Sequence, residues 1–160
     1  MRKNISFSGL DETDLAILRA VQSDARVSNA RLAEQVSLSE TPCWRRLKRL
    51  EADGFVREHV ALLDREKLGF GVLAFAQVSF GDHAGEAPER FEQAVKAIPQ
   101  ILACHNTTGD FDYLLQIVAT DLAAYGEFVR DVLRKLPGVT AIHSNLSLRE
   151  VKATSALPLA

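Results

Sequence analysis

The clearest pattern of hydrophobic and polar positions in the chain lies in residues 39–54, which read SETPCWRRLKRLEADG. Three apolar residues, Cys43, Leu47 and Leu50, are spaced four and then three positions apart. Residues at this spacing share one face of an α-helix, and an apolar face of this kind is normally buried. A serine before the first turn and a glycine after the last are typical of helix ends. The pattern therefore predicts a helix over residues 39–53.

The opposite face of this predicted helix is polar and largely cationic, because four of the five residues from Arg45 to Arg49 are Lys or Arg. The DNA major groove admits one α-helix, and Arg or Lys can bond a guanine edge there. A charged outer face is also ordinary for a helix in water, and taken alone this face is more often a solvated surface. The residues predicted to contact DNA are Arg45, Lys48 and Arg49, positioned by Ser39, Thr41 and Trp44.

Two shorter helical patterns precede this one, opening at Asp11 and at Ser28. Two helices joined by a tight connection, the second of them basic, are typical of a helix-turn-helix with the recognition helix last. Arg31 is a candidate phosphate contact, with a plain surface arginine as an equal alternative. Residues 1–9 resemble a loose arm, and the β-branched residues within 55–63 predict a short strand or wing.

A different pattern follows a charged linker at residues 64–70. It predicts a strand, a helix, two strands joined by a Gly-Asp turn, a helix and a last strand, over residues 72–80, 86–98, 101–108, 111–119, 121–136 and 139–148. This βαββαβ order is the ferredoxin-like arrangement. The predicted fold class is α+β, with a winged helix-turn-helix domain at 1–63 and a ferredoxin-like domain at 71–160. The helices would cover one sheet face, and we expect the other face, which carries apolar groups, to be buried against a second copy.

Charge changes this picture only locally. The chain of 160 residues has a net charge of −2, so it carries no overall attraction for nucleic acid. Residues 1–63 hold ten Lys and Arg against nine Asp and Glu, whereas the remaining residues hold nine against twelve. Any DNA-binding surface is therefore a local patch in the first part of the chain.

Cysteine and histidine usage argues against a metal site or a catalytic site. The two cysteines, Cys43 and Cys104, make no disulfide framework. The four histidines are scattered without ligand spacing, and Asp112 with His105 is the single pair with catalytic potential. We therefore expect no enzyme activity, no cofactor and no metal. No secretory-type apolar run occurs, and no apolar stretch is long enough to cross a membrane, which predicts a cytoplasmic protein.

Three stretches carry a family resemblance, namely LDETDLAILRAVQSDAR, LAEQVSLSETPCWRRLKRLEADGFV and NTTGDFDYLLQI. In this order they resemble the opening helix, the helix-turn-helix and the ligand-loop signature of the leucine-responsive/asparagine regulator (Lrp/AsnC) family of bacterial and archaeal transcription regulators. The likeness runs from about Leu10 to about Glu150, nearly all the chain. Glu40 and Trp44 depart from the commonest pattern of the family.

The resemblance implies a homodimer that pairs through its C-terminal domains, often assembles further into octamers, and binds double-stranded DNA with paired helix-turn-helix units. It also implies a small-molecule effector, for many members an amino acid, held between neighbouring C-terminal domains. An aspartate could meet the ammonium group of an amino acid, and a threonine hydroxyl or backbone N–H groups could meet its carboxylate. The implied effector-binding residues are Thr107, Thr108, Gly109, Asp110 and Asp112. Without the family, Gly109-Asp110 is ordinary turn chemistry.

The leading hypothesis is therefore a sequence-specific DNA-binding transcription regulator whose assembly or DNA binding is modulated by a small molecule, with an amino acid as the expected class. The alternative is a DNA-compacting, chromatin-like assembly protein with weak sequence preference. The ratio of specific to non-specific DNA affinity at a stated salt concentration separates the two hypotheses.

Overall fold

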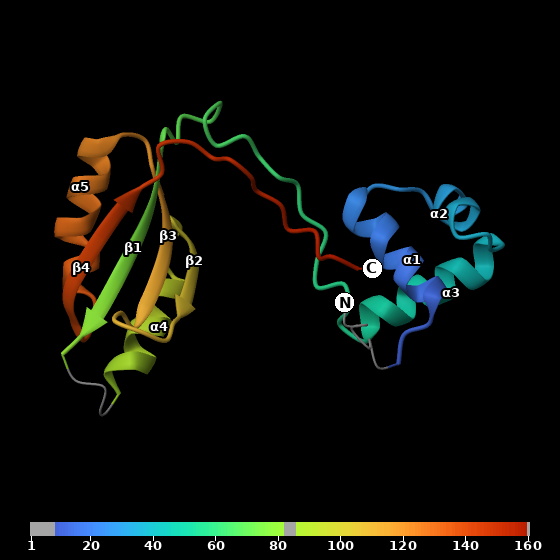
Figure 1. Ribbon diagram of the computed structural model, residues 1–160, viewed down its shortest axis with the longest axis horizontal. Coiled ribbons are helices and arrows are strands. Elements are labelled where there is room, and N and C mark those ends of the chain that lie inside the picture. Colours follow the sequence, from blue (N-terminus) through green and yellow to red (C-terminus); the bar gives the residue numbers. More distant parts are fainter. Residues whose placement is uncertain (1–8, 82–85, 160) are drawn as a thin grey trace, which may run out of the picture. The chain divides into compact units, whose positions relative to one another are not determined.

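The computed structural model describes residues 9–81 and 86–159, which form two compact units (Figure 1). The first unit comprises Met1–Leu62 together with Ala153–Ala160, and the second unit comprises the residues between these segments. All but the last residue of the predicted N-terminal arm lie outside the described residues. Each unit has its own hydrophobic core, so each is described by itself.

The first unit contains the three predicted helices, α1 (Glu12–Ser23), α2 (Asn29–Gln35) and α3 (Glu40–Ala52). A reciprocal capping box begins α1. The Asp11 carboxylate accepts the N–H of Asp14 at 2.8 Å, and the Asp14 carboxylate accepts the N–H of Asp11 at 3.2 Å. The helices pack on a shared core of Ile17, Val21, Leu32, Ala33, Cys43 and Leu50. The predicted apolar face of the third helix therefore lies inward, as the spacing indicated.

The recognition helix α3 begins at the predicted position, but the Ser39 side chain does not cap it. Ser39 has the extended backbone of an N-cap residue, and its hydroxyl makes no capping hydrogen bond. At the other end, Gly54 has a φ of +79° and donates its N–H to the Glu51 carbonyl at 3.0 Å. Phe55 donates its N–H to the Leu50 carbonyl at 2.9 Å. This is the Schellman arrangement, which places glycine in the left-handed conformation at little steric cost.

The short strand predicted after α3 does not form. Residues 55–63 hold no strand and occupy the wing position after α3. Their apolar side chains stay outside the core, with Val60 61% and Leu62 84% exposed. A strand needs a hydrogen-bonded neighbour, and the described part of this unit offers no other strand. The β-branched residues alone therefore did not decide the structure here.

The second unit has the predicted βαββαβ order. Its elements are β1 (Val72–Phe80), α4 (Ala87–Lys96), β2 (Ile101–Asn106), β3 (Tyr113–Ala119), α5 (Leu122–Asp131), a 3-10 turn at Leu133–Lys135, and β4 (Val139–Leu146). The four strands pair antiparallel in the order β2-β3-β1-β4. This is the ferredoxin-like arrangement of an α+β fold, so the predicted fold class is confirmed.

Both helices of this unit pack against the same face of the sheet. Alternate residues of β1 and β3, including Val78 and Leu115, meet Phe91 of α4 and Tyr125 of α5 in one buried cluster. Aromatic rings close the α4 side, where the centroids of Phe91 and Tyr113 lie 4.7 Å apart. The opposite face of the sheet is consequently left without a helix.

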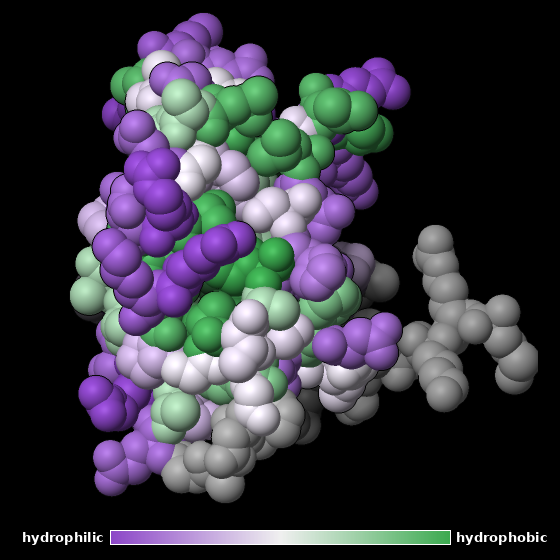
Figure 2. Space-filling model, turned by 90° about the vertical axis from the view of Figure 1, so that its left-hand side faces the viewer, coloured by the Kyte–Doolittle hydropathy of each residue, from purple (hydrophilic) through white to green (hydrophobic). Residues whose placement is uncertain are grey.

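The uncovered sheet face carries polar as well as apolar side chains. The cross-strand register aligns one row of residues over all four strands, His105, Leu114, Gln77 and His143. Three of these four side chains are polar. Figure 2 views this unit from the side on which α5 lies in Figure 1, and there too hydrophobic and hydrophilic side chains lie next to one another. The alternation of side chains along a strand predicts which residues share a face. It does not predict that all of them are apolar.

The end of the chain lies along α1 in the first unit (Figure 1). Gln22 binds the backbone of Leu157 twice, donating to its carbonyl at 3.0 Å and accepting its N–H at 3.0 Å. Arg19 donates to the Leu159 carbonyl at 3.0 Å. The sequence pattern did not indicate these contacts, because an exposed glutamine on a helix shows no preference for a partner.

Replacing Gln22 by Ala should release the C-terminal segment from α1. Gln22→Ala removes both hydrogen bonds to Leu157, each with a net worth of about 0.5–1.5 kcal/mol. The Leu157 amide should then exchange its hydrogen several-fold faster, measured by NMR. Gln35→Ala is the control, because Gln35 is an exposed glutamine of α2 that makes no side-chain hydrogen bond with the described residues. Equal exchange at Leu157 in the wild type and in Gln22→Ala would contradict the contact.

Candidate functional site

The turn between α2 and α3 sets the direction of the recognition helix. Ser37 adopts a φ of +55° and donates its N–H to the Glu34 carbonyl at 3.2 Å, while Leu38 donates to the Ala33 carbonyl at 2.9 Å. The same hydrogen-bond pattern ends α3, here with serine in the position that usually holds glycine. Leu38 packs at the edge of the helical core. The predicted tight connection is therefore a hydrogen-bonded turn anchored by an apolar side chain.

All seven residues predicted to contact or approach DNA are exposed, namely Arg31, Ser39, Thr41, Trp44, Arg45, Lys48 and Arg49. The opposite face of α3 is closed, since Cys43 and Leu50 are 0% exposed. Trp44 is 51% exposed, although tryptophan is usually well buried. The helix thus presents a cationic face with one large aromatic ring to solvent.

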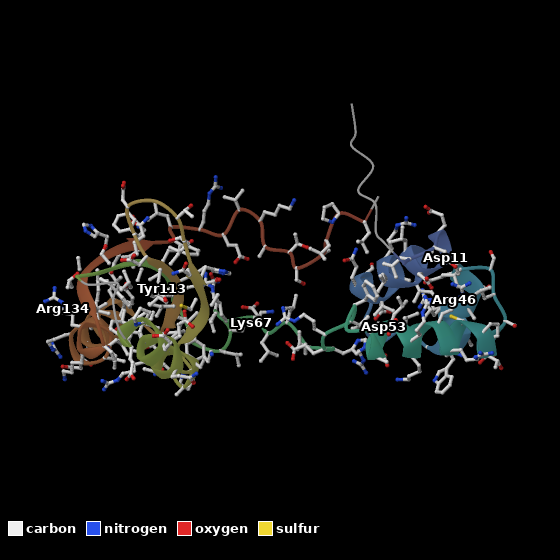
Figure 3. The ribbon with its side chains drawn as sticks, turned by 90° about the horizontal axis from the view of Figure 1, so that it is seen from below. Asp11, Arg46, Asp53, Lys67, Tyr113 and Arg134 are labelled. Atoms are coloured by element: carbon white, nitrogen blue, oxygen red, sulfur yellow. The ribbon has the colours of Figure 1, made fainter. Side chains whose placement is uncertain are left out.

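The arginines of α3 differ in their contacts. Arg46 donates to Asp11 at 2.6 Å and to Asp14 at 2.8 Å, and Figure 3 shows Asp11 and Arg46 close together. Arg49 also pairs with Asp14, whose side chain is 1% exposed. The hydrogen bond to Asp11 is the main cause that raises the pKa of Arg46. The pKa of Asp11 is lowered, first by the Asp14 N–H and then by Arg46. These ion pairs join the start of α1 to the side of α3.

Lys48 pairs within its own helix, whereas Arg45 does not. Lys48 donates to the Glu51 carboxylate at 2.6 Å, and this contact is the main cause that lowers the pKa of Glu51. Arg45 makes no hydrogen bond or ion pair with the described residues. Arg45 is therefore the basic residue of α3 that is most available to a DNA phosphate or base.

The four-residue cluster of Asp11, Asp14, Arg46 and Arg49 was missed from the sequence. Acidic residues in the first turn of α1 looked like partners of the helix dipole, and Arg46 lies to the side of the predicted DNA-facing surface. The distance between α1 and α3 is set by the tertiary fold. No sequence pattern therefore predicted that these four charged side chains lie in contact.

The second candidate site is the hairpin loop between β2 and β3, which spans residues 107–112. It is longer than the predicted Gly-Asp turn, because Thr107 donates its N–H to the Asp112 carbonyl at 2.9 Å and its hydroxyl to the Phe111 carbonyl at 2.9 Å. Gly109 has a φ of +114°, a conformation that favours glycine. The structure therefore brings the five predicted effector residues into one loop.

The five loop residues differ in whether their polar groups are available to a ligand. One Asp112 carboxylate oxygen accepts the N–H of Phe80 at 2.7 Å, which ties the loop to the end of β1. The Thr107 hydroxyl is used inside the loop. Thr108 and Asp110 are exposed and make no hydrogen bond or ion pair with the described residues. Asp110 is thus the better candidate to meet an ammonium group.

A cavity of about 370 Å³ lies beside the loop, between α4 and the edge strand β2. Its walls are mostly apolar, with Glu92 and Lys96 supplying one charge of each sign. The Tyr113 hydroxyl donates to Glu92 at 2.9 Å, and burial is the main cause that raises the pKa of Tyr113 to about 12. Asn106 connects cavity and loop, because it lines the cavity and donates to the Asp112 carbonyl at 3.2 Å.

The structure does not support the catalytic pair considered above. His105 lies on the uncovered sheet face, whereas the Asp112 carboxylate bonds the end of β1. Among the described residues, no group of three His, Cys, Asp or Glu side chains could hold a metal ion. No helix in the described part of the chain is long and apolar enough to cross a membrane.

Comparison with known proteins assigns both units. Residues 10–57 match the winged helix-turn-helix DNA-binding family, and residues 73–157 match the Lrp/AsnC ligand binding domain. The chain belongs to the Lrp/AsnC family of transcription regulators. As a member of this family, it combines a DNA-binding unit with a ligand-binding unit, which confirms the family resemblance and the predicted function class.

Individual Lrp/AsnC relatives match over almost the whole chain. It is 42% identical to the Bkd operon transcriptional regulator of Pseudomonas aeruginosa, covering 94% of this chain and 98% of that one. It is 38% identical to the DNA-binding transcriptional activator DecR of Escherichia coli, covering 94% and 99%. A transcriptional regulator of Neisseria meningitidis, solved in complex with L-Met, superposes with a TM-score of 0.90 at 44% identity, covering 94% and 97%.

Replacing Arg45 should weaken DNA binding without disturbing the fold. Arg45→Ala removes an exposed guanidinium that makes no contact within the described residues. The slope of log K against log salt should fall by about one unit for each lost phosphate contact. Arg134→Ala removes the same charge from an exposed position of the second unit and should keep the wild-type slope. Wild-type affinity and slope for Arg45→Ala would exclude this residue as a DNA contact.

Two aspartates of the loop should respond differently to substitution. Asp110→Ala should weaken amino-acid binding and leave the melting temperature of the free protein near wild type. Asp112→Ala should lower the free energy of unfolding by about 1–3 kcal/mol, because the Phe80 N–H loses its acceptor. Calorimetric titration with the common amino acids and thermal unfolding measure the two effects. The opposite result, stable Asp112→Ala and unstable Asp110→Ala, would contradict these roles.

Proposed function

We propose that this Lrp/AsnC protein is a sequence-specific transcription regulator whose DNA binding is modulated by an amino acid. The observation that carries the proposal is the exposed α3 face with an uncommitted Arg45, in a chain whose second unit is a ligand-binding domain. The chain acts by binding, and no catalytic role is assigned to it. Its proposed place of action is the cytoplasm.

At the DNA, α3 enters the major groove with its cationic face inward. Arg45, Lys48 and Arg49 supply phosphate or guanine contacts, because Arg and Lys bond the guanine edge or the backbone. Trp44 supplies a large apolar surface suited to a thymine methyl group. The remaining residues of the proposed DNA surface position the helix by contacting the DNA backbone. They are Arg31, Ser39 and Thr41.

The charge arrangement favours a specific regulator over a DNA-compacting protein. Sequence-independent binding depends on the number of cations that reach phosphates. On α3, Arg46, Lys48 and Arg49 all pair with carboxylates of their own unit, and the whole chain has a net charge of −2. Of the four basic side chains of α3, Arg45 is therefore the one that pairs with no carboxylate of the described residues. An affinity that is nearly equal for selected and unrelated duplexes would instead support compaction.

The proposed effector site combines the loop 107–112 with a neighbouring subunit. Asp110 meets the ammonium group of the amino acid, while the Thr108 hydroxyl and the backbone near Gly109 meet its carboxylate. A related regulator, 44% identical over 94% of this chain, was solved in complex with L-Met. This relation supports an amino acid as the effector class, with an apolar side chain as the first candidate.

The proposed assembly is a homodimer formed through the uncovered sheet face, with further association to an octamer. A row of residues crosses all four strands of this face, and its centre holds the half-buried Leu114 beside Gln77. A mixed surface of this kind suits an interface whose polar groups pair across the two copies. Because the effector lies between subunits, it acts by favouring one arrangement of subunits over another.

Two measurements on the full chain test the proposed function. Selection from a random duplex library should enrich one sequence, with an affinity at least about a thousandfold above that for unrelated DNA at physiological salt. Thermal unfolding with each common amino acid in excess should show one that raises the melting temperature, because it binds the native state alone. The proposed regulation is excluded if no amino acid does so and none changes DNA affinity.

A charge placed on the uncovered sheet face should dissociate the assembly. Leu114→Glu puts a carboxylate at the centre of the proposed interface, where desolvation is costly. Sedimentation of the full chain should then show a monomer at concentrations at which the wild type is a dimer. Leu122→Glu, at a position of α5 that is 61% exposed, is the matched control and should keep the dimer. Equal masses for all three proteins would place the interface elsewhere.

A further inference from the structure

The two arginines that pair with Asp14 differ in the number of carboxylates that they bond. Arg46 bonds two carboxylates, those of Asp11 and Asp14, and its side chain is 33% exposed. Arg49 bonds Asp14 alone, and its side chain is 47% exposed. A buried carboxylate needs a charged partner, and Arg46 by itself satisfies this need. Arg49 can therefore leave Asp14 without stranding a buried charge, whereas Arg46 cannot leave both carboxylates at low cost.

Arg49 also stands at the boundary between the ion-pair cluster and the DNA-facing surface. It follows Arg45 by four residues, so the two side chains lie on the same side of α3. Arg46 lies further toward α1, where Asp11 and Asp14 hold it. Of the two guanidiniums paired with Asp14, that of Arg49 is thus the one that DNA can reach.

We propose that Asp14 is a positioning residue for DNA recognition, which withholds Arg49 from phosphates in non-specific complexes and yields it in the specific complex. The inference rests on the proposed DNA-binding function. In the specific complex, α3 is seated in the groove and offers Arg49 a fixed phosphate or guanine acceptor, which replaces the Asp14 carboxylate. In a loose complex no acceptor is fixed, so the buried, preorganised carboxylate keeps Arg49.

This exchange would raise specificity without adding a contact to the operator. Non-specific affinity depends on the number of phosphates neutralised, and Asp14 lowers that number by one for each recognition helix. The specific complex still gains the Arg49 contact. Asp14 would therefore widen the ratio between the two affinities, although its own side chain is 1% exposed and does not reach DNA.

The direct test is Asp14→Asn. Asparagine keeps an oxygen that can accept the Asp11 N–H, but it removes the charge that holds Arg49. The salt slope on an unrelated duplex should steepen by about 0.9 per recognition helix, which is about a threefold larger loss of affinity between 50 and 200 mM salt. The affinity ratio of a library-selected duplex to a shuffled duplex of equal length should fall.

Glu12→Gln is the matched control. It removes one negative charge from the same turn of α1, where Glu12 lies 3.8 Å from Arg19 and pairs with no residue of α3. Its slope on the unrelated duplex should stay at the wild-type value. The double variant Asp14→Asn/Arg49→Ala should lose the steepening seen in Asp14→Asn, because the released cation is absent.

An unchanged or shallower slope for folded Asp14→Asn would overturn the inference. If Asp14→Asn does not fold, Arg49→Ala decides, because it leaves Asp14 paired with Arg46. Arg49→Ala should lower the slope by about one unit on the selected duplex and by clearly less on the shuffled one. An equal loss on both duplexes would refute the exchange. A wild-type chain that selects no duplex would refute the proposed function itself, which separates the two failures.

Discussion

The buried carboxylate of Asp14 is the interaction on which the DNA-binding unit depends. Its side chain is 1% exposed, and both Arg46 and Arg49 of α3 pair with it. The same carboxylate completes the capping box of α1. One side chain therefore begins the first helix and orients the recognition helix. An ion pair at this depth contributes less to net stability than to a defined geometry, because desolvation offsets much of its attraction.

In the ligand-binding unit, some polar residues of the hairpin loop hold the loop in shape and others remain exposed. Asp112 and Thr107 build the hairpin loop through bonds to Phe80 and Phe111, whereas Thr108 and Asp110 stay exposed. Groups that shape a site and groups that can meet a ligand are thus different members of one short segment. A loop held in this way presents its free groups with little loss of conformational entropy on binding.

Two chain segments join the units. After α3 the chain continues through the exposed residues 55–63, and after β4 it returns to the first unit, where Gln22 and Arg19 bind its last residues. One connection follows α3, and the other ends in hydrogen bonds to α1. Coupling between effector and DNA requires only that the ligand prefers one of the arrangements that these connections allow.

The sequence alone predicts the three helices, the βαββαβ order and the exposed candidate surface, because hydrophobic periodicity and helix-end signals act over a few positions. It also placed Arg45 correctly on the outer face of α3. The tertiary structure decided which charges are already paired, as for Arg49 with Asp14, and which loop residues are structural, as for Asp112. It likewise decided that residues 55–63 find no partner strand. Such contacts join positions far apart in the chain, and local patterns carry no information about the distance between them.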